Sequence, residues 1–143
     1  MFVNTTYSNR DNQDLIDDLV GKRFGFIEKL KRKGVGSSRM IVGEISQHFS
    51  QVTNVHQELT YANIELRPGG ILVHLNSARK SFIWAIPFYQ LVIYKTNGFS
   101  IHCNGNFIHF KNDKLYRENK SFFKNLMQAK IDFDNLYPSP TMV

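Results

Sequence analysis

The spacing of apolar residues changes at Met40, and this change divides the chain into two parts. Before Met40 the apolar positions recur every three or four residues, at Leu15, Ile16, Leu19, Val20, Phe24, Ile27 and Leu30. This spacing predicts an amphipathic helix in an N-terminal segment, 1–39. Asp11 is its expected N-cap and Gly34 its expected stop, while residues 1–10 are polar and are expected to fray.

Two glycines leave a second interpretation of this segment open. Gly21 and Gly25 lie inside the helical pattern, and a glycine in a helix interior costs about 1 kcal/mol. The alternative is a short helix that ends at Val20 and is followed by a strand from Phe24 to Leu30. Whether residues 21–32 are helix or strand therefore stays open.

From Met40 onward apolar and polar residues alternate, which predicts an antiparallel β meander over residues 40–111. Seven strands are expected, over Met40–Phe49, Thr60–Leu66, Ile71–Leu75, Phe82–Ile86, Tyr89–Lys95, Phe99–Cys103 and Phe107–Lys111. Arg67-Pro68-Gly69-Gly70 predicts a turn, and Asn97-Gly98 and Asn104-Gly105 predict tight hairpins.

The last hairpin also predicts a register. A two-residue turn at Asn104-Gly105 pairs Cys103 with Asn106, Ile101 with Ile108, and Phe99 with Phe110. These pairs give one apolar face, and His102, Phe107, Ser100 and His109 fall on the other.

Helical spacing returns after the strands. Asn119 is the expected N-cap of a C-terminal helix over 119–131, with an apolar stripe at Phe122, Phe123, Leu126, Met127 and Ile131, and residues 132–143 form a tail. The length of 143 residues suits one domain, 1–143. The predicted fold class is mainly β (α+β), with seven antiparallel strands and a helical segment at each end.

This order of elements resembles the pleckstrin-homology-like fold, in which seven antiparallel strands form two sheets or an open barrel that a C-terminal helix caps. The stretch from Ser81 to Leu91 (SFIWAIPFYQL) is similar to the middle of small bacterial pleckstrin-homology-like domains. The resemblance covers about residues 40–131, and the chain as a whole also resembles a small bacterial protein. It implies a binding or adaptor module.

The positive charge of the chain is concentrated in one segment. Residues 22–39 contain seven cations and one anion, at Lys22, Arg23, Lys29, Lys31, Arg32, Lys33, Arg39 and Glu28. This excess equals the net charge of +6, because acids and bases balance elsewhere. The chain therefore has a local basic patch and is not basic throughout.

The basic segment is the candidate anion-binding site. Its expected binding residues are Lys29, Lys31, Arg32, Lys33, Ser37, Ser38 and Arg39. Cations supply the field, serine hydroxyls donate hydrogen bonds, and Gly34 and Gly36 let backbone N–H groups approach an anion. The segment is expected to be an exposed, mobile loop with little apolar packing. The alternative is a solvated helix end and linker.

No pattern indicates catalysis, a cofactor or a metal. His102 and His109 share a face of the last hairpin, but no third ligand is apparent. Cys103 points to the opposite face from His102, so the two cannot act as nucleophile and base. We therefore expect no enzyme activity, no cofactor and no metal ion.

The sequence leaves three functional hypotheses. The first is a binding module for a protein or peptide partner, and a homo-oligomer stays open. The second is recruitment to an anionic membrane or to nucleic acid through residues 29–39, and the third and weakest is an enzyme. A single cysteine, no signal-like N-terminus and no long apolar run predict a cytoplasmic protein without a transmembrane segment.

Overall fold

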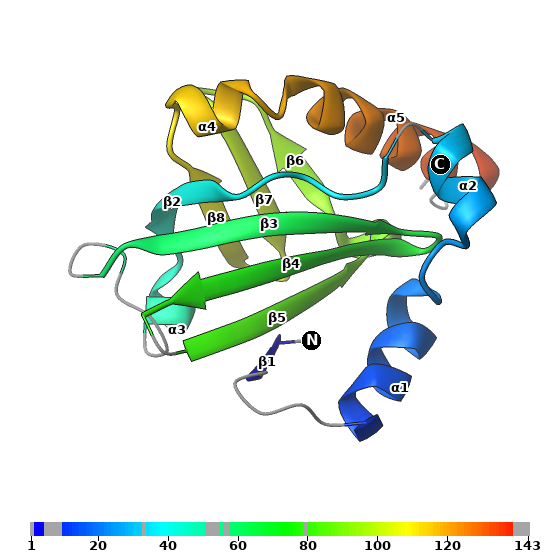
Figure 1. The fold of residues 1–143 in the computed structure, drawn as a ribbon, viewed down its shortest axis with the longest axis horizontal. Helices are drawn as coiled ribbons and strands as arrows, with labels where there is room; N and C mark the ends of the chain where they lie inside the picture. The colour runs from blue at the N-terminus through cyan, green and yellow to red at the C-terminus, as the bar shows by residue number, and fades with distance from the viewer. Residues whose placement is uncertain are drawn as a thin grey trace, which may run out of the picture.

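The computed structural model describes residues 2–4, 10–32, 34–50, 55, 58–78 and 80–138. In these residues one eight-stranded antiparallel sheet forms the body of the molecule (Figure 1). Its strands are β1 (Phe2–Asn4), β2 (Met40–Ile45), β3 (Thr60–Arg67), β4 (Gly70–Ser77), β5 (Lys80–Pro87), β6 (Val92–Tyr94), β7 (Phe99–Cys103) and β8 (Asn106–Phe110). The helices are α1 (Arg10–Val20), α2 (Phe26–Lys31), α3 (Gln47–Ser50), the 3-10 turn η1 (Phe88–Gln90), α4 (Lys114–Arg117) and α5 (Lys120–Leu136).

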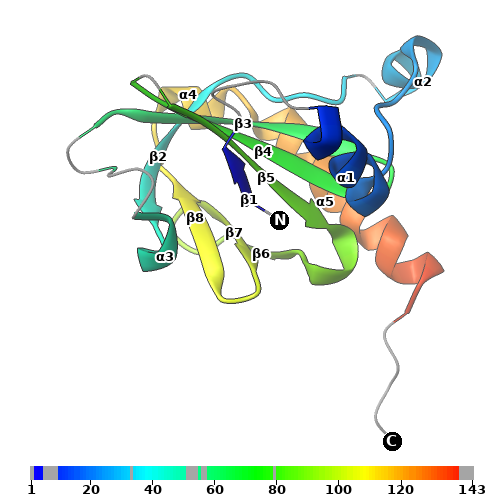
Figure 2. The ribbon, with the colours of Figure 1, turned by 90° about the horizontal axis from the view of Figure 1, so that it is seen from below.

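Strand β2 joins the two halves of the sheet. The strand order is β1-β5-β4-β3-β2-β8-β7-β6, so β2 pairs with β3 along one edge and with β8 along the other. Met40 and Ile41 pair with β3, whereas the residues from Val42 to Ile45 pair with β8. The register shifts between Val42 and Glu44, which places a β-bulge at Gly43. The two halves of the sheet lie at an angle to each other (Figure 2), and both contribute buried side chains to one main core cluster.

The core lies between the two halves of the sheet and α5. Alternate residues of each long strand point into it, such as Ile64 of β3 and Trp84 of β5. Phe123 of α5 closes the core, with its ring centroid 3.9 Å from that of Phe99 and 5.9 Å from that of Phe110. A smaller cluster on the outer face of β4 and β5 packs against α1 through Ile16 and Val20.

The C-terminal end of α1 is fixed on the turn between β3 and β4. Gly21 has a φ of +88°, the left-handed conformation that ends a helix. The N–H of Gly69 donates to the carbonyl of Val20 at 2.8 Å. Arg67 is 1% exposed and donates to the Gly21 carbonyl at 2.7 Å and to Asp17 Oδ1 at 3.0 Å. The chain therefore leaves α1 from a fixed point.

The structure confirms the seven predicted strands as β2 to β8, the helix after Asn119 and the antiparallel, mainly β class. It also confirms the register of the last hairpin, with Cys103 opposite Asn106, Ile101 opposite Ile108 and Phe99 opposite Phe110. Asn104 has a φ of +51° and Gly105 a φ of +82°, which is the backbone that this two-residue turn requires.

The single helix expected over residues 11–32 was wrong, and the alternative was correct in ending a short helix at Val20 but wrong in placing a strand after it. The single helix is wrong because Gly21 ends α1, and the strand is wrong because Phe26–Lys31 forms the short helix α2. The expectation that residues 1–10 fray was wrong for Phe2–Asn4, which pairs with β5 as an edge strand. Phe2 holds this strand in place by stacking on Phe49 and Phe82.

Three element boundaries differ from the prediction by three residues or more. The strand expected over Tyr89–Lys95 begins only at Val92, because Phe88–Gln90 forms the 3-10 turn η1. The strand expected over Met40–Phe49 ends at Ile45, because the turn of α3 carries Phe49 into the core, where its ring lies 4.8 Å from Trp84. The last helix continues beyond Ile131 to Leu136, so the predicted tail begins later. Phe133 stabilises this extension because its ring packs against Phe88, with centroids 5.4 Å apart.

Candidate functional site

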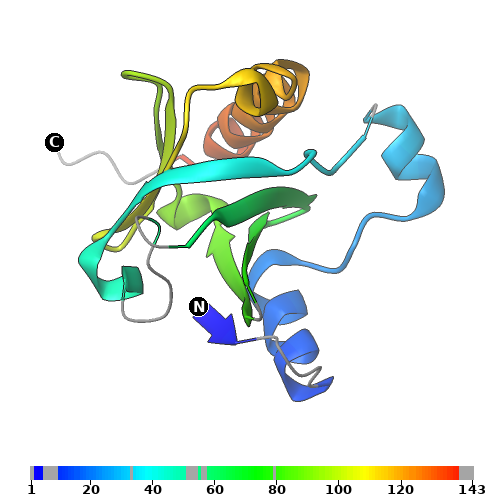
Figure 3. The same ribbon diagram turned by 60° about the vertical axis from the view of Figure 1, so that its left-hand side comes forward.

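The helix α2 protrudes from the body of the molecule and buries none of its residues (Figure 3). Its large apolar side chains face solvent: Phe26 is 76% exposed, Ile27 70% and Leu30 64%. Exposed apolar residues are ordinary when they are scattered, but these three lie within five positions of one helix. We call residues Lys22 to Arg32 the α2 tip.

Cations surround these apolar residues. The α2 tip contains five exposed cations, at Lys22, Arg23, Lys29, Lys31 and Arg32. Its one acid, Glu28, is paired with Arg32, with Nε and Oε1 3.2 Å apart. Arg23 Nε lies 3.8 Å from Oε1 of Glu65 on β3, and the Arg23 side chain is largely exposed. The tip therefore combines an apolar surface with an excess of positive charge.

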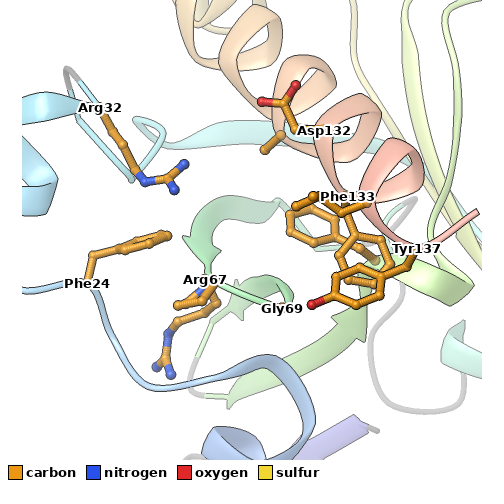
Figure 4. A pocket seen from close by; sticks show the side chains of 11 residues that line it. Phe24, Arg32, Arg67, Gly69, Asp132, Phe133 and Tyr137 are labelled. Atoms are coloured by element: carbon orange, nitrogen blue, oxygen red, sulfur yellow. The ribbon is translucent and has the colours of Figure 1, made fainter.

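A hollow of about 540 Å³ separates the α2 tip from the end of α5 (Figure 4). Phe24 and Arg32 line one side of it, and Phe133 and Tyr137 line the other. The Arg32 guanidinium lies over the Phe24 ring, 4.3 Å from its centroid. A second hollow of about 310 Å³ also lies between α2 and α5. Phe26, Ile27 and Leu30 line neither hollow, and their exposure shows that no described element covers them.

The predicted anion-binding residues fall into two groups. Lys29, Lys31 and Arg32 are exposed on α2, and Lys33 lies outside the described residues. Ser37, Ser38 and Arg39 follow on a separate stretch that runs along β3. The six described residues therefore lie on two separate segments and do not form one site.

The stretch along β3 is not the unpacked loop that was expected, and that expectation was wrong. Val35 is buried in the core, and its carbonyl accepts the N–H of Leu66. Ser37 exchanges two hydrogen bonds with Ile64: its N–H donates to the Ile64 carbonyl, and its Oγ accepts the Ile64 N–H at 2.8 Å. The N–H of Ser38 donates to Asn119 Oδ1. The backbone N–H groups of Ser37 and Ser38 therefore already have acceptors within the protein and are not available to an anion.

Burial is the main influence on the pKa values of His102 and Cys103, which are neighbours on β7. His102 Nε2 lies 3.0 Å from Ser100 Oγ, and burial, with a smaller effect of His109, lowers the pKa of His102. Burial also raises the pKa of the Cys103 thiol, which favours its unreactive protonated form. In the described part of the chain, no three His, Cys, Asp or Glu side chains gather as ligands for a metal ion.

The apolar half of the α2 tip was missed by the sequence analysis. The helix interpretation places Ile27 and Leu30 on the apolar face of a long helix, and the strand alternative places Phe26 on one face with Phe24 and Leu30. The glycines at 21 and 25 were the available signal, because a helix that they interrupt cannot keep one continuous face on the core.

Within the described residues, none of the helices is both long and apolar enough to span a bilayer. Comparisons of the chain with protein-family models, with curated proteins and with solved structures give no match.

Proposed function

We propose that this protein is a non-enzymatic binding module that attaches to anionic membrane surfaces through the α2 tip. The observation that carries the proposal is the exposure of Phe26, Ile27 and Leu30 among five cations. A helix with apolar side chains on one side and cations beside them is suited to the boundary between lipid headgroups and acyl chains. The module attaches as a peripheral protein.

Both parts of the tip contribute to this binding. Burying an exposed Phe, Ile or Leu side chain in the acyl region is worth about 1.5–3 kcal/mol. A Lys or Arg close to an anionic leaflet adds about 1 kcal/mol. Because salt screens the attraction between the cations and the anionic lipids, binding should weaken as the salt concentration rises.

The apolar residues favour a membrane over nucleic acid. Contacts to a phosphate backbone need cations and hydrogen-bond donors, and stacking on bases needs aromatic rings. Ile27 and Leu30 supply neither, yet 70% and 64% of their surfaces are exposed. In a lipid bilayer these two side chains are buried among the acyl chains.

The strand order supports assigning the module to the pleckstrin-homology-like type. Strands β2 to β5 and β6 to β8 form two antiparallel meanders, β8 returns to pair with β2, and α5 packs at the end of the chain. In this proposal the sheet is the scaffold and the α2 tip is the contact surface. Binding of a protein or peptide partner stays a second prediction.

Vesicle sedimentation tests the proposal. Parent protein is mixed with vesicles of neutral phosphatidylcholine, or with vesicles that also contain phosphatidylserine. We expect binding to the anionic vesicles only, and its loss in the Phe26→Ser/Leu30→Ser variant and in the Lys29→Gln/Lys31→Gln variant. Lys111→Gln/Lys114→Gln is the matched control, because it removes two exposed cations away from the tip.

The same experiment separates the alternatives. If the parent does not bind anionic vesicles, the membrane proposal is wrong and a protein partner becomes the leading hypothesis. If only the charge variant loses binding, and the parent also binds duplex DNA, the tip is an electrostatic site for nucleic acid.

A further inference from the structure

A groove with an apolar floor runs between α5 and the hairpin of β6 and β7. Its volume is about 540 Å³, within the range of small-molecule sites. Phe99 and Phe123 form the inner part of the floor, and Tyr116, Met127 and Ile131 extend it outward. Residues of the α2 tip do not line it, so the groove is separate from the proposed membrane contact.

The rim of the groove is positively charged. Lys95, Lys120 and Lys124 line the groove itself. An adjoining hollow of about 370 Å³ shares Lys95 and Lys120 with it and adds Arg117. No Asp or Glu side chain lines either space.

These four cations have no carboxylate partner in the described part of the chain. Elsewhere on α5 the chain does supply one, since Lys130 pairs with Asp134 at 2.9 Å. Like charges around one groove repel each other, and Lys120 and Lys124 are also four positions apart on one helix, where like charges destabilise it. A bound anion would remove this repulsion.

We propose that the groove binds a small amphiphilic anion, which is an organic carboxylate or phosphate that carries an apolar chain or ring. The apolar part lies on Phe99, Phe123 and Met127. The anionic group lies at the rim, where Lys95, Lys120 and Lys124 donate charge-assisted hydrogen bonds. A neutral molecule of the same shape fills the floor but leaves the cations unpaired.

Calorimetric titration with single-chain probes tests this site without vesicles. The probes are decanoate, decyl phosphate and decanol, the two anions below the concentration at which they form micelles and decanol below its solubility limit. We expect the parent to bind at least one of the two anions, and to bind decanol at least about tenfold more weakly, which corresponds to the loss of one charged hydrogen bond. The anion that binds more tightly identifies the headgroup.

Three variants locate the binding. Lys120→Gln/Lys124→Gln should weaken anion binding about tenfold or more and leave decanol binding unchanged. Lys111→Gln/Lys114→Gln and the tip variant Phe26→Ser/Leu30→Ser should bind the anions like the parent. The last comparison distinguishes failure of this site from failure of the proposed membrane contact.

Three results would overturn the proposal, of which the first two concern the parent protein. The first is equal affinity of the parent for decanoate, decyl phosphate and decanol, and the second is no binding at all. The third is an equal loss of anion binding in both lysine variants, which would indicate nonspecific charge attraction. The melting temperature of Lys120→Gln/Lys124→Gln should equal or exceed that of the parent, because the substitution removes repulsion, so weaker binding cannot be attributed to unfolding.

Discussion

The buried guanidinium of Arg67 on β3 donates to the carboxylate of Asp17 on α1, with Nη1 and Oδ1 3.0 Å apart. Arg67 is 1% exposed, its Nη1 also donates to the carbonyl of Gly21, and its Nε donates to the carboxylate of Glu65. One side chain therefore joins the sheet to the helix from which the α2 tip departs. The position of the tip depends on this contact.

Replacing Arg67 should destabilise the fold strongly. Arg67→Ala leaves Asp17, Glu65 and the Gly21 carbonyl without their buried donor, and loss of one member of a buried ion pair costs about 3–5 kcal/mol. We expect about 3 kcal/mol, since both carboxylates are partly exposed and regain water. Urea unfolding measures the loss. Lys80→Ala, at an exposed position, should stay within about 0.5 kcal/mol of the parent.

Phe123 and Phe26 form a matched pair of aromatic residues with opposite environments. Phe123 is 5% exposed and packs on Phe99, whereas Phe26 is 76% exposed. Phe123→Ala should therefore cost about 3–5 kcal/mol of unfolding free energy, and Phe26→Ala less than about 0.5 kcal/mol. Thermal and urea unfolding of both variants check this. Similar losses would mean that Phe26 is packed, which contradicts its role as an exposed contact residue.

Two glycines should respond in opposite ways to alanine. Gly21 has a φ of +88°, and an added Cβ would lie 3.2–3.3 Å from Pro68, so Gly21→Ala should cost at least about 1–2 kcal/mol. Gly25 precedes α2 with a φ of −68° and open space around it. Gly25→Ala should leave stability unchanged or raise it by up to about 1 kcal/mol. Equal effects in urea unfolding would contradict the helix end at Gly21.

Stability should fall as the pH falls below neutral, in part because of His74. Burial lowers the pKa of His74 below 6.5, while Glu65 raises it and Arg23 and Arg67 lower it. The unfolded chain therefore binds a proton at this site before the folded protein does. The contribution of His74 is complete above pH 6.5 and is lost as the pH falls from 6.5 through the folded-state pKa.

The urea midpoint, measured between pH 8 and pH 5, tests this sign. As the pH falls from 8 to 5, the urea concentration at the unfolding midpoint should decrease more for the parent than for His74→Gln. A parallel decline in the two proteins would show that His74 titrates alike in the folded and unfolded states.

Local turn chemistry explains why the last hairpin was predictable. The Asn104-Gly105 turn fixes its own register, and the apolar pairs on either side agree with it. The strand at Phe2–Asn4 was not predictable in this way. It has three residues, and its partner β5 lies about eighty positions later, so no local pattern marks the pairing.

The candidate sites were harder to predict than the fold. Ile27 and Leu30 have the same spacing as residues of a buried helix, and only the turn at Gly21 directs them to solvent. The cations of the groove come from separate segments. Lys120 and Lys124, four positions apart on α5, were a local signal, but Lys95 joins them only through the packing of the hairpin against that helix.

The shared strand β2 has a consequence for how the chain is made. During synthesis β2 can pair with β3 early, but its other edge, from Val42 to Ile45, has no partner until β8 leaves the ribosome. An unpaired strand edge is a template for association with another chain. A nascent chain that stalls between β5 and β8 would thus expose a strand edge that the finished protein pairs, so slow translation of that interval is expected to favour aggregation.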